Sequence, residues 1–481
     1  MAVNYGSGYA PAPAATKGSL LAGAYLDFTG TTDTTWAQQY LPELLEKESE
    51  VFGNRSISGF LSKVGAEEAM ASDQVVWSEQ GRLHLGYTVT VGGTGTTLTV
   101  TANSDGSTAT ATDHGVRAGD MMVVADADAT VKCFVTAVNS TTGVITVKPY
   151  TNTQLNAAGI ADQADVKAFV FGSEYVKGSV GRDSSNDPGF KSYSNNPIII
   201  KDKFEVSGSD ASAIGWVEVS GEEGQTGYLW YLKAEGDTRA RFNDYLEMVC
   251  IEAEKVTNAT SATQTDAEGS LKGTEGLFAA VNSRGNVSDA IDGTSDLSEF
   301  DLVLKQLDKN GAIEENMLFI DRATSLNIDD MLAAQNSYGD GGTSFGVFDN
   351  DADMALNLGF SGFRRGSYDF YKSDWKYLND ASTRGAINGI SSKADPVKGV
   401  LIPAGVSSVY DQALGKNLKR PFLHVRYRAS QTESRQYKTW VTGSVGATTS
   451  DLDAMEVNYL SERCLVVQGA NNFVIFKGSY S

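Results

Sequence analysis

The sequence predicts an α+β fold into which a small β-barrel or β-sandwich domain is inserted. Three observations support this. Residues 86–172 are rich in Thr, Val, Ala and Gly and alternate with period two; residues 225–256 carry apolar side chains at helical spacing; and from there on, strand and helix patterns alternate up to the C-terminal end. With 481 residues the chain is long enough for two to four domains.

The N-terminal stretch, MAVNYGSGYAPAPAATKGSLLAGAYLD, predicts a flexible arm. It lacks the basic segment and the apolar segment of a secretory signal. Residues 35–52 carry a helical pattern with acidic residues and predict a short amphipathic helix. No run of eighteen apolar residues occurs, so we expect no membrane span.

The inserted block predicts seven short strands separated by Gly, Asn and Asp turns. The spacing of about 10 to 15 residues from strand to strand is typical of a small barrel or sandwich. The predicted strands cover residues 87–91, 96–101, 107–112, 121–124, 131–138, 143–148 and 166–171.

Residues 225–256 predict the longest helix of the chain. At 1.5 Å per residue it would be roughly 45–50 Å long, which requires a large sheet or several neighbours to lie on. Its apolar stripe is predicted at Leu229, Leu232, Phe242, Tyr245, Leu246, Val249 and Ala253.

The remaining segments predict shorter elements. Residues 295–311 read as a helix that Ser295 or Asp296 caps and Gly311 ends. The other predictions are a strand, turn and helix at 315–332, aromatic-rich strand at 363–378, a strand and turn at 398–414, an antiparallel pair at 420–430 and 435–445, and two closing strands around QGANN in 453–481.

Charge restricts the classes of partner. Lys and Arg number 39 and Asp and Glu number 60, which gives a net charge of −21. A surface that binds nucleic acid tightly needs clustered cations, so we do not expect tight nucleic-acid binding. A negative surface is nevertheless suited to a protein that encloses DNA without binding it tightly. Arg364 and Arg365, beside Phe363 and Tyr368, could stack on bases or form salt bridges between subunits.

No motif predicts catalysis or a cofactor. Phosphate loops, nucleophile elbows and paired cysteines are absent from the sequence, and the three widely spread cysteines are expected to be buried thiols in a reducing compartment. The three histidines, His84, His114 and His424, lack ligand spacing. DNDAD (349–353) fails as an EF-hand loop, which leaves a solvated acidic loop or another cation site.

The stretch VWSEQGRLHLGY (76–87) resembles the lining of an active site in composition. In an extended strand, however, Trp77 and Glu79 face one side while Arg82 and His84 face the other. Glu79 and Arg82 would then not converge on one substrate, and the charged residues of this stretch can pair with another subunit instead, which makes Glu79, Arg82 and His84 candidate intersubunit contacts.

Three segments resemble the major capsid proteins of tailed double-stranded DNA bacteriophages, the Hong Kong 97-type fold, including those of crAss-like phages. QTGYLWYLKAEGDTRARFNDYLEMVCIEAEKV resembles that family's spine helix, and ENMLFIDRATSLNIDDM resembles the strand and helix that enter its axial domain. LSERCLVVQGANNFVIFKGSYS is similar to its C-terminal signature, in which Glu-Arg opens a strand and an apolar strand ends in Lys-Gly.

The resemblance implies a division into an arm, an extended loop and two domains. Residues 1–52 would form the N-terminal arm, 53–87 and 170–200 the two sides of the E-loop, and 88–169 its inserted β-domain. Residues 201–314 and 420–481 would form the peripheral domain, and 315–419 the axial domain. On the first side of the E-loop, Trp77 would anchor the contact to a neighbouring subunit. Arg182, on the returning side, joins Arg364 and Arg365 as a candidate intersubunit contact.

The resemblance also implies a function and partners. The chain would assemble with itself as pentamers and hexamers into the icosahedral shell of a virion, without cofactor or enzymatic activity. Portal, scaffold and decoration or auxiliary proteins would be its other partners, with enclosed double-stranded DNA and no membrane. A β-rich bacterial surface-array or adhesin protein is the alternative.

Overall fold

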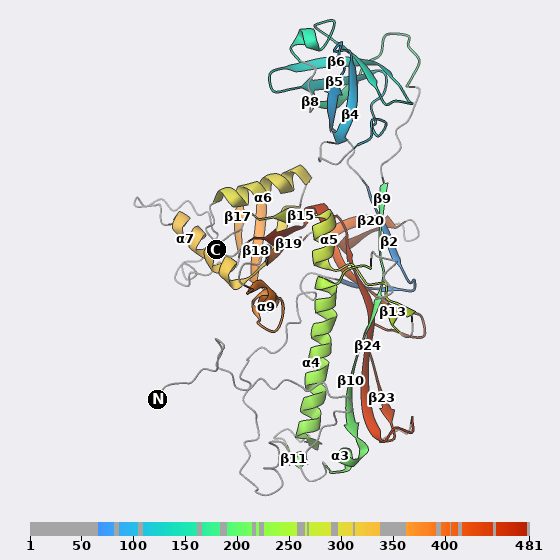
Figure 1. Cartoon of the computed structure of the whole chain (residues 1–481), viewed down its shortest axis with the longest axis vertical. Coiled ribbons are helices and arrows are strands. Elements are labelled where there is room, and N and C mark those ends of the chain that lie inside the picture. The colour runs from blue at the N-terminus through green and yellow to red at the C-terminus, as the bar shows by residue number, and fades with distance from the viewer. Residues whose placement is uncertain are drawn as a thin grey trace. The chain divides into compact units, whose positions relative to one another are not determined.

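We describe the protein from a computed structural model of the whole chain (Figure 1). The described residues are 66–80, 86–103, 109–160, 166–182, 190–213, 218–220, 226–256, 265–266, 269–289, 297–310, 313–336, 362–390, 396–404, 406–411, 416–445 and 449–478. The chain divides into two compact units: Trp77–Tyr193, here the barrel unit, and the residues before and after it, here the main unit.

Six strands of the barrel unit close into a barrel in the order β3-β4-β7-β6-β5-β8. Their alternating side chains fill the interior. On β5, for example, Met122 and Val124 are fully buried while Met121, Val123 and Ala125 are partly exposed. The bounds are β3 Gly86–Val91, β4 Thr97–Asn103, β5 Asp120–Ala125, β6 Thr130–Val138, β7 Ile145–Pro149 and β8 Val166–Ser173, with a short 3₁₀ helix, η1, at Asn156–Ala158. A barrel is therefore found where a barrel or a sandwich was predicted.

The strand predicted at residues 107–112 is wrong for the part that is described. Residues 109–112 form a loop with a turn in which the Asp113 amide donates to the Thr110 carbonyl. β3 pairs with β8 and closes the barrel with six strands, so no free edge remains for a seventh. Gly143 (φ +69°) lies so close to the Ala111 carbonyl that a Cβ there would clash, so this loop can approach the β6–β7 turn only because position 143 is a glycine.

Two strands distant in sequence, β2 (Val75–Gln80) and β9 (Phe190–Asn195), form a separate two-stranded sheet, here the ribbon. β2 precedes the barrel strands in the sequence and β9 follows them. The chain therefore passes along β2, forms the barrel, and then passes along β9, which pairs with β2.

The first sheet of the main unit is built around one long strand, β24 (Ala454–Val467). β10 (Ile198–Ser207) pairs along one edge of β24. Along the other edge, β22 (Leu423–Arg428) and β23 (Lys438–Gly443) pair with successive parts of it. β1 (Ala66–Met70) adds a parallel edge strand beside β22.

The predicted antiparallel pair at 420–430 and 435–445 is wrong. β22 and β23 each pair with β24, and only the single bridge between Ala429 and Ser434 joins the two segments. With 14 residues, β24 is long enough to receive both strands one after the other.

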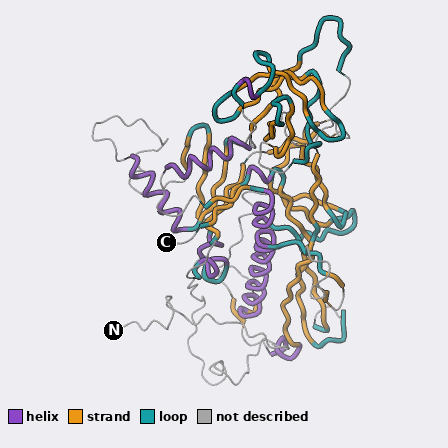
Figure 2. Tube along the Cα trace, turned by 45° about the horizontal axis from the view of Figure 1, so that its top comes forward, coloured by secondary structure: helices purple, strands orange, loops and turns teal. Residues whose placement is uncertain are grey.

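The long helix α4 (Leu229–Glu252) lies along this sheet (Figure 1, Figure 2). Its buried stripe passes through Thr238, Phe242, Leu246 and Cys250 at four-residue steps. Tyr245, predicted on that stripe, lies beyond its edge and is 40% exposed. The helix is shorter than the predicted range because residues Thr226–Tyr228 form a strand, β12, that pairs with β11 (Glu218–Ser220).

The second sheet of the main unit has six strands in the order β15-β25-β19-β16-β18-β17. Its central strand, β19, is buried along its whole length. The bounds are β15 Asn286–Ser288, β16 Glu315–Ile320, β17 Gly362–Arg365, β18 Tyr368–Asp374, β19 Val397–Pro403 and β25 Val474–Lys477.

The predicted helix at 295–311 and the strand, turn and helix at 315–332 are confirmed by α6, β16 and α7. The capping residues Ser295, Asp296 and Gly311 lie outside the described residues, as do the arm, residues 1–52, and its helix. The helices are α3 Gly208–Ala213, α5 Leu277–Arg284, α6 Leu297–Asn310, α7 Arg322–Asn336, α8 Lys376–Asn379, α9 Arg384–Asn388 and the 3₁₀ helix η4 Ala470–Asn472. Two small pairs complete the elements: β13 Thr265–Asp266 with β14 Gly269–Ser270, and β20 Val406–Asp411 with β21 Lys416–Pro421.

Candidate functional site

The ribbon brings two of the predicted contact residues together. The Trp77 indole N–H donates to Glu79 Oε1 at 3.0 Å, and the Trp77 ring lies 6.2 Å from the Tyr193 ring on the opposite strand. Trp77 is only 8% exposed. Glu79 therefore accepts a hydrogen bond from Trp77 of the same strand. Two strand residues that are two positions apart point to the same face, so their side chains can meet. Arg82 and His84 lie outside the described residues.

The other face of β2 presents an apolar side chain to solvent, since Val76 is 60% exposed. A two-stranded sheet is marginally stable by itself in water. Its outer edges also carry backbone groups that a further chain can pair with. The ribbon thus has the physical properties of a segment that gains stability by lying on another surface.

Arg182 is tied to the barrel unit. Its guanidinium forms an ion pair with Asp120, whose side chain is 4% exposed, and Nε donates to the Tyr175 hydroxyl at 3.1 Å. Asp120 also accepts from the Arg117 amide at 2.8 Å. Burial and the nearby Arg117 charge lower the pKa of Arg182. This residue holds the loop after β8 against the start of β5.

Arg364 and Arg365 form ion pairs with their own chain. Arg365 donates two hydrogen bonds of 2.9 Å to Asp301 on α6, while Arg364 Nε lies 3.6 Å from Asp369 and its side chain is 65% exposed. The neighbouring rings of Phe363 and Tyr368 are buried. They are not available to stack on bases, so the aromatic part of the nucleic-acid hypothesis is wrong.

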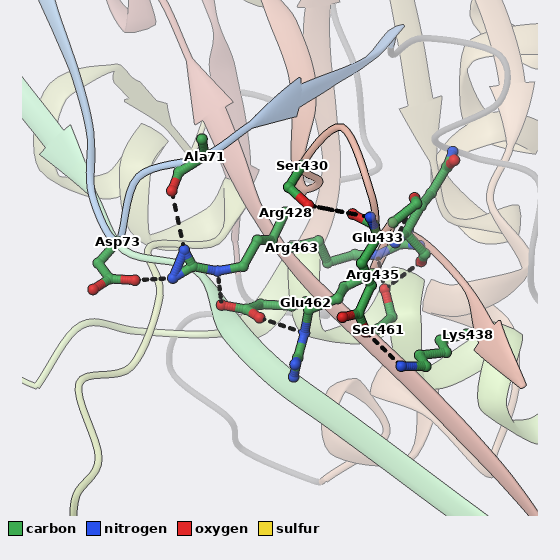
Figure 3. A network of polar contacts seen from close by, with 12 residues as sticks. Ala71, Asp73, Arg428, Ser430, Glu433, Arg435, Lys438, Ser461, Glu462 and Arg463 are labelled. Atoms are coloured by element: carbon green, nitrogen blue, oxygen red, sulfur yellow. Dashed lines mark hydrogen bonds and ion pairs between the residues drawn. The ribbon is translucent and has the colours of Figure 1, made fainter. Parts of the chain in front are cut away.

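A network of charged side chains connects β1, β22 and β24 (Figure 3). Glu462, on β24, lies between two guanidiniums: its Oε1 is 2.8 Å from Arg428 Nε and its Oε2 is 2.7 Å from Arg435 Nε. Arg428 also donates to the Ala71 carbonyl at 3.2 Å and pairs with Asp73. The hydrogen bond with Glu462 raises the pKa of Arg428.

Arg463 extends the same network. It donates to Ser461 Oγ at 2.9 Å and to the Gln436 carbonyl at 3.0 Å, and it lies 3.6 Å from Glu67. Beside it, Arg426 pairs with Glu68 at 2.8 Å. The two strands β22 and β24 therefore fix β1 and the turn after it, which leads directly into the ribbon.

Sequence reasoning missed this network. Glu462 and Arg463 lie in the middle of β24, so the expectation that this Glu-Arg pair opens a strand is wrong. A usable signal was present, because charged residues inside apolar strand segments such as LHVRYR and LSERCLVV require buried partners. The identity of the partners was not readable from local patterns. Arg428 and Arg435 lie about 30 residues before Glu462, and the partners on β1 and in the turn after it lie more than 300 residues earlier.

The described residues contain no group of three or more His, Cys, Asp or Glu side chains arranged to hold a metal ion. His114 Nε2 is 2.8 Å from the Gly143 carbonyl, which gives that ring a structural contact. Cys133, Cys250 and Cys464 are buried, and burial raises the pKa of each thiol to about 12. DNDAD (349–353) lies outside the described residues.

No described helix combines the length and the apolar character that crossing a bilayer requires.

No protein-family model matches the sequence, and no curated protein matches it. Solved structures that are similar include the capsid of the native GTA particle, with 9% identity over 93% of this chain and 99% of that chain and a TM-score of 0.38. A Microbacterium phage Oxtober96 chain matches with 10% identity over 92% of this chain and 97% of that one, at a TM-score of 0.35. The mature capsid of bacteriophage PhiM1 matches with 9% identity over 64% of this chain and 79% of that chain, at a TM-score of 0.32. These TM-scores are too low to assign a shared fold.

Proposed function

We propose that this chain is the major capsid protein of a tailed double-stranded DNA bacteriophage, with the Hong Kong 97-type fold and an inserted barrel domain. The ribbon is the observation that carries the proposal. Among the described residues its two strands pair in a sheet only with each other, Val76 is exposed, and the charged network braces the turn from which the ribbon starts. A braced, extended segment of this kind is suited to lie across a neighbouring subunit.

The remaining parts follow from this assignment. Residues 1–52 serve as the arm, the ribbon as part of the E-loop, α4 as the spine helix of the peripheral domain, and residues 315–419 as the axial domain. The chain assembles with itself as pentamers and hexamers, and portal, scaffold and decoration proteins complete the virion. The net charge of −21 lets enclosed DNA move without adhering to the shell.

The proposal includes the predicted contact residues, with different roles. Trp77 stiffens the ribbon through Glu79 and Tyr193. Arg182 and Arg365 are held by acids of their own chain, whereas the exposed Arg364 side chain, with its longer 3.6 Å contact, remains available to a neighbour. Arg82 and His84 keep the role predicted from the sequence.

Expression of the full chain followed by sedimentation velocity and negative-stain electron microscopy tests the proposal. We expect capsomers of five and six subunits or closed shells. Flat two-dimensional lattices would instead favour the β-rich surface-array alternative. A chain that stays monomeric at every concentration would refute self-assembly.

A charge reversal tests the ribbon directly. Glu79→Lys removes the acceptor of the Trp77 indole and is expected to reduce assembly at least tenfold while far-UV circular dichroism of the monomer stays unchanged. Asp113→Lys, which reverses the charge of an exposed acid outside the ribbon and outside the main unit, is the matched control and should assemble like the wild type. Equal assembly of both variants would remove Glu79 from the interface.

A further inference from the structure

One outer face of the barrel is apolar where a solvated surface would be polar. β8 carries Phe169 and Phe171 on its outward side, 49% and 46% exposed. In the strand register, Val123 of β5 lies opposite Phe169, and Met121 of β5 lies opposite Phe134 of β6. We call these five residues, Met121, Val123, Phe134, Phe169 and Phe171, the barrel patch.

The five residues of the patch come from three neighbouring strands, β8, β5 and β6. Neighbouring strands lie about 4.8 Å apart and same-face residues of one strand lie about 7 Å apart, so these side chains are within contact distance of one another. Gly172 contributes by lacking a side chain, because a Cβ there would lie 2.8 Å from Met121 Cε. Met121 can therefore lie over the β8 backbone and extend the apolar surface.

Cations surround the patch. The exposed strand residues beside it include Lys132 opposite Val123, Lys148 opposite Phe134, and Lys167 on β8. β6, β7 and β8 contain no Asp or Glu, and the one acid of β5, Asp120, is buried against Arg182.

Two acids near this face accept hydrogen bonds within the barrel unit, and a third, Asp128 in the β5–β6 turn, is exposed. Glu174 accepts a 2.6 Å hydrogen bond from the Tyr150 hydroxyl, and Asp126 accepts from the Asp128 and Ala129 amides in the β5–β6 turn. The barrel patch is therefore an apolar centre with a positive rim, on a chain that is strongly acidic as a whole.

The distribution of charge identifies the complementary surface. Of the net charge of −21, the barrel unit carries only −3, from eight Lys and Arg against eleven Asp and Glu, so −18 lies on the main unit. Two barrel patches facing each other would bring lysines together, which disfavours a symmetric barrel-to-barrel contact. A contact from the patch of one copy to the main unit of another joins opposite charges.

We propose that the barrel patch docks on the acidic main unit of a second copy of this chain. This inference rests on the proposed self-assembly and names the surfaces that meet. Burial of the patch removes apolar side chains from water, while the lysine rim orients the contact by pairing with carboxylates. The contact is heterologous, with different surfaces on the two copies, as closed rings and shells require.

Cross-linking of the assembled full chain tests which surfaces meet. Chains labelled with ¹⁵N and unlabelled chains are mixed, assembled and treated with a carbodiimide, which joins a lysine amine to a carboxylate in contact with it. We expect cross-links of mixed isotope between Lys132 or Lys148 and Asp or Glu residues of the main unit. Links confined to a single chain, links between two barrels, or no links from these lysines in formed shells would each overturn the inference.

A variant pair gives a second, independent measurement. Phe169→Ser with Phe171→Ser changes only outward positions and is expected to raise the concentration needed for half-maximal assembly about tenfold. Val176→Ser with Val180→Ser, at positions 79% and 82% exposed outside the patch, is the matched control and should assemble like the wild type. Circular dichroism establishes that both variants are folded.

The outcomes separate the two proposals. A wild-type chain that never assembles refutes the proposed function, and the docking inference falls with it. Shells that form normally from the Phe169→Ser, Phe171→Ser variant refute the docking inference alone.

Discussion

Glu462 is the residue on which the charged network depends. Its side chain is 9% exposed and lies between Arg428 and Arg435, whose side chains are 27% and 30% exposed. Without the carboxylate, two guanidiniums would face each other in a poorly solvated place. Removing one partner of a buried ion pair is costly because the remaining charge keeps its desolvation penalty.

Glu462→Gln is therefore expected to reduce the free energy of unfolding of the main unit by about 2 kcal/mol, a value below that of fully buried pairs because the arginines are partly solvated. Urea unfolding monitored by circular dichroism measures this. Glu433→Gln is the control, since Glu433 pairs with Lys438 on the surface and its loss should leave unfolding unchanged. A similar effect of both variants would contradict the special role of Glu462.

Glu456 makes the sheet sensitive to acid. Hydrogen bonds from Thr442 and from Lys203 hold the pKa of this carboxyl below its usual value of 4.5. A carboxyl with a lowered folded-state pKa contributes stability above its unfolded pKa, and that contribution is lost as pH falls through the folded-state value.

The melting temperature of the wild type should consequently exceed that of Glu456→Gln at pH 7, and the difference should decrease below about pH 4.5. Differential scanning calorimetry from pH 3 to pH 7 measures it. A difference that is constant over this range would show that the ionised carboxylate is not the source of the stability.

At the scale of elements, the end of the ribbon is fixed by Asn195, the last residue of β9. Its fully buried side chain donates to the Leu465 carbonyl at 2.6 Å and to the Glu275 carbonyl at 3.0 Å. Its Oδ1 accepts from the Glu275 amide at 2.8 Å and from the Thr274 hydroxyl at 3.2 Å. One amide thus joins β9 to β24 and to the segment before α5.

Asn195→Ala should destabilise the main unit by about 3 kcal/mol, because several buried backbone groups would lose their partners together. Hydrogen exchange should show faster exchange at β9 and at Glu275 in this variant. Asn196→Ala, at the adjacent and only partly buried position, is the control. Unchanged exchange at β9 would indicate that the strand is held by other contacts.

At the scale of the whole molecule, the apolar cores of the two units are separate. The cluster inside the barrel consists of residues from Tyr87 to Val170, and the three other clusters draw every member from the main unit. None of the described side chains of the barrel unit therefore belongs to the apolar cores of the main unit.

Replacing residues 86–173 by a Gly-Ser linker of about eight residues should leave the main unit folded, since Gly86 and Phe169 are neighbours in the sheet and the two ends lie within reach of such a linker. The melting temperature of the main unit should change by less than about 3 °C. Under the docking inference, assembly of this variant should be weakened. Unfolding of the entire chain would contradict the independence of the two units.

Local patterns predicted most elements of both units. The alternation of β5 and β6 and the helical repeat through Phe242 and Leu246 are consequences of side chains within a few residues of each other. The wrong predictions depend on contacts between positions that are far apart in the sequence. Residues 109–112 lack a sheet edge to join, and β22 and β23 find their partner in β24. Tyr245 has the helical spacing of the predicted stripe, but it is 40% exposed, because the buried stripe passes through Phe242 and Leu246 on either side of it in sequence.

The sequence by itself determined the α+β class, the barrel-forming segment, the long helix and the acidic balance, because periodicity and composition are local properties. Only the tertiary structure decided which charged side chains form ion pairs with each other within the chain. It placed Glu462 between Arg428 and Arg435. It also paired Arg182 with Asp120 of the barrel unit and Arg365 with Asp301 of the main unit. It also gathered Phe134 and Phe169 on one face. These pairings join distant positions, and the energy of a charge or an apolar side chain depends on the neighbours that folding brings to it.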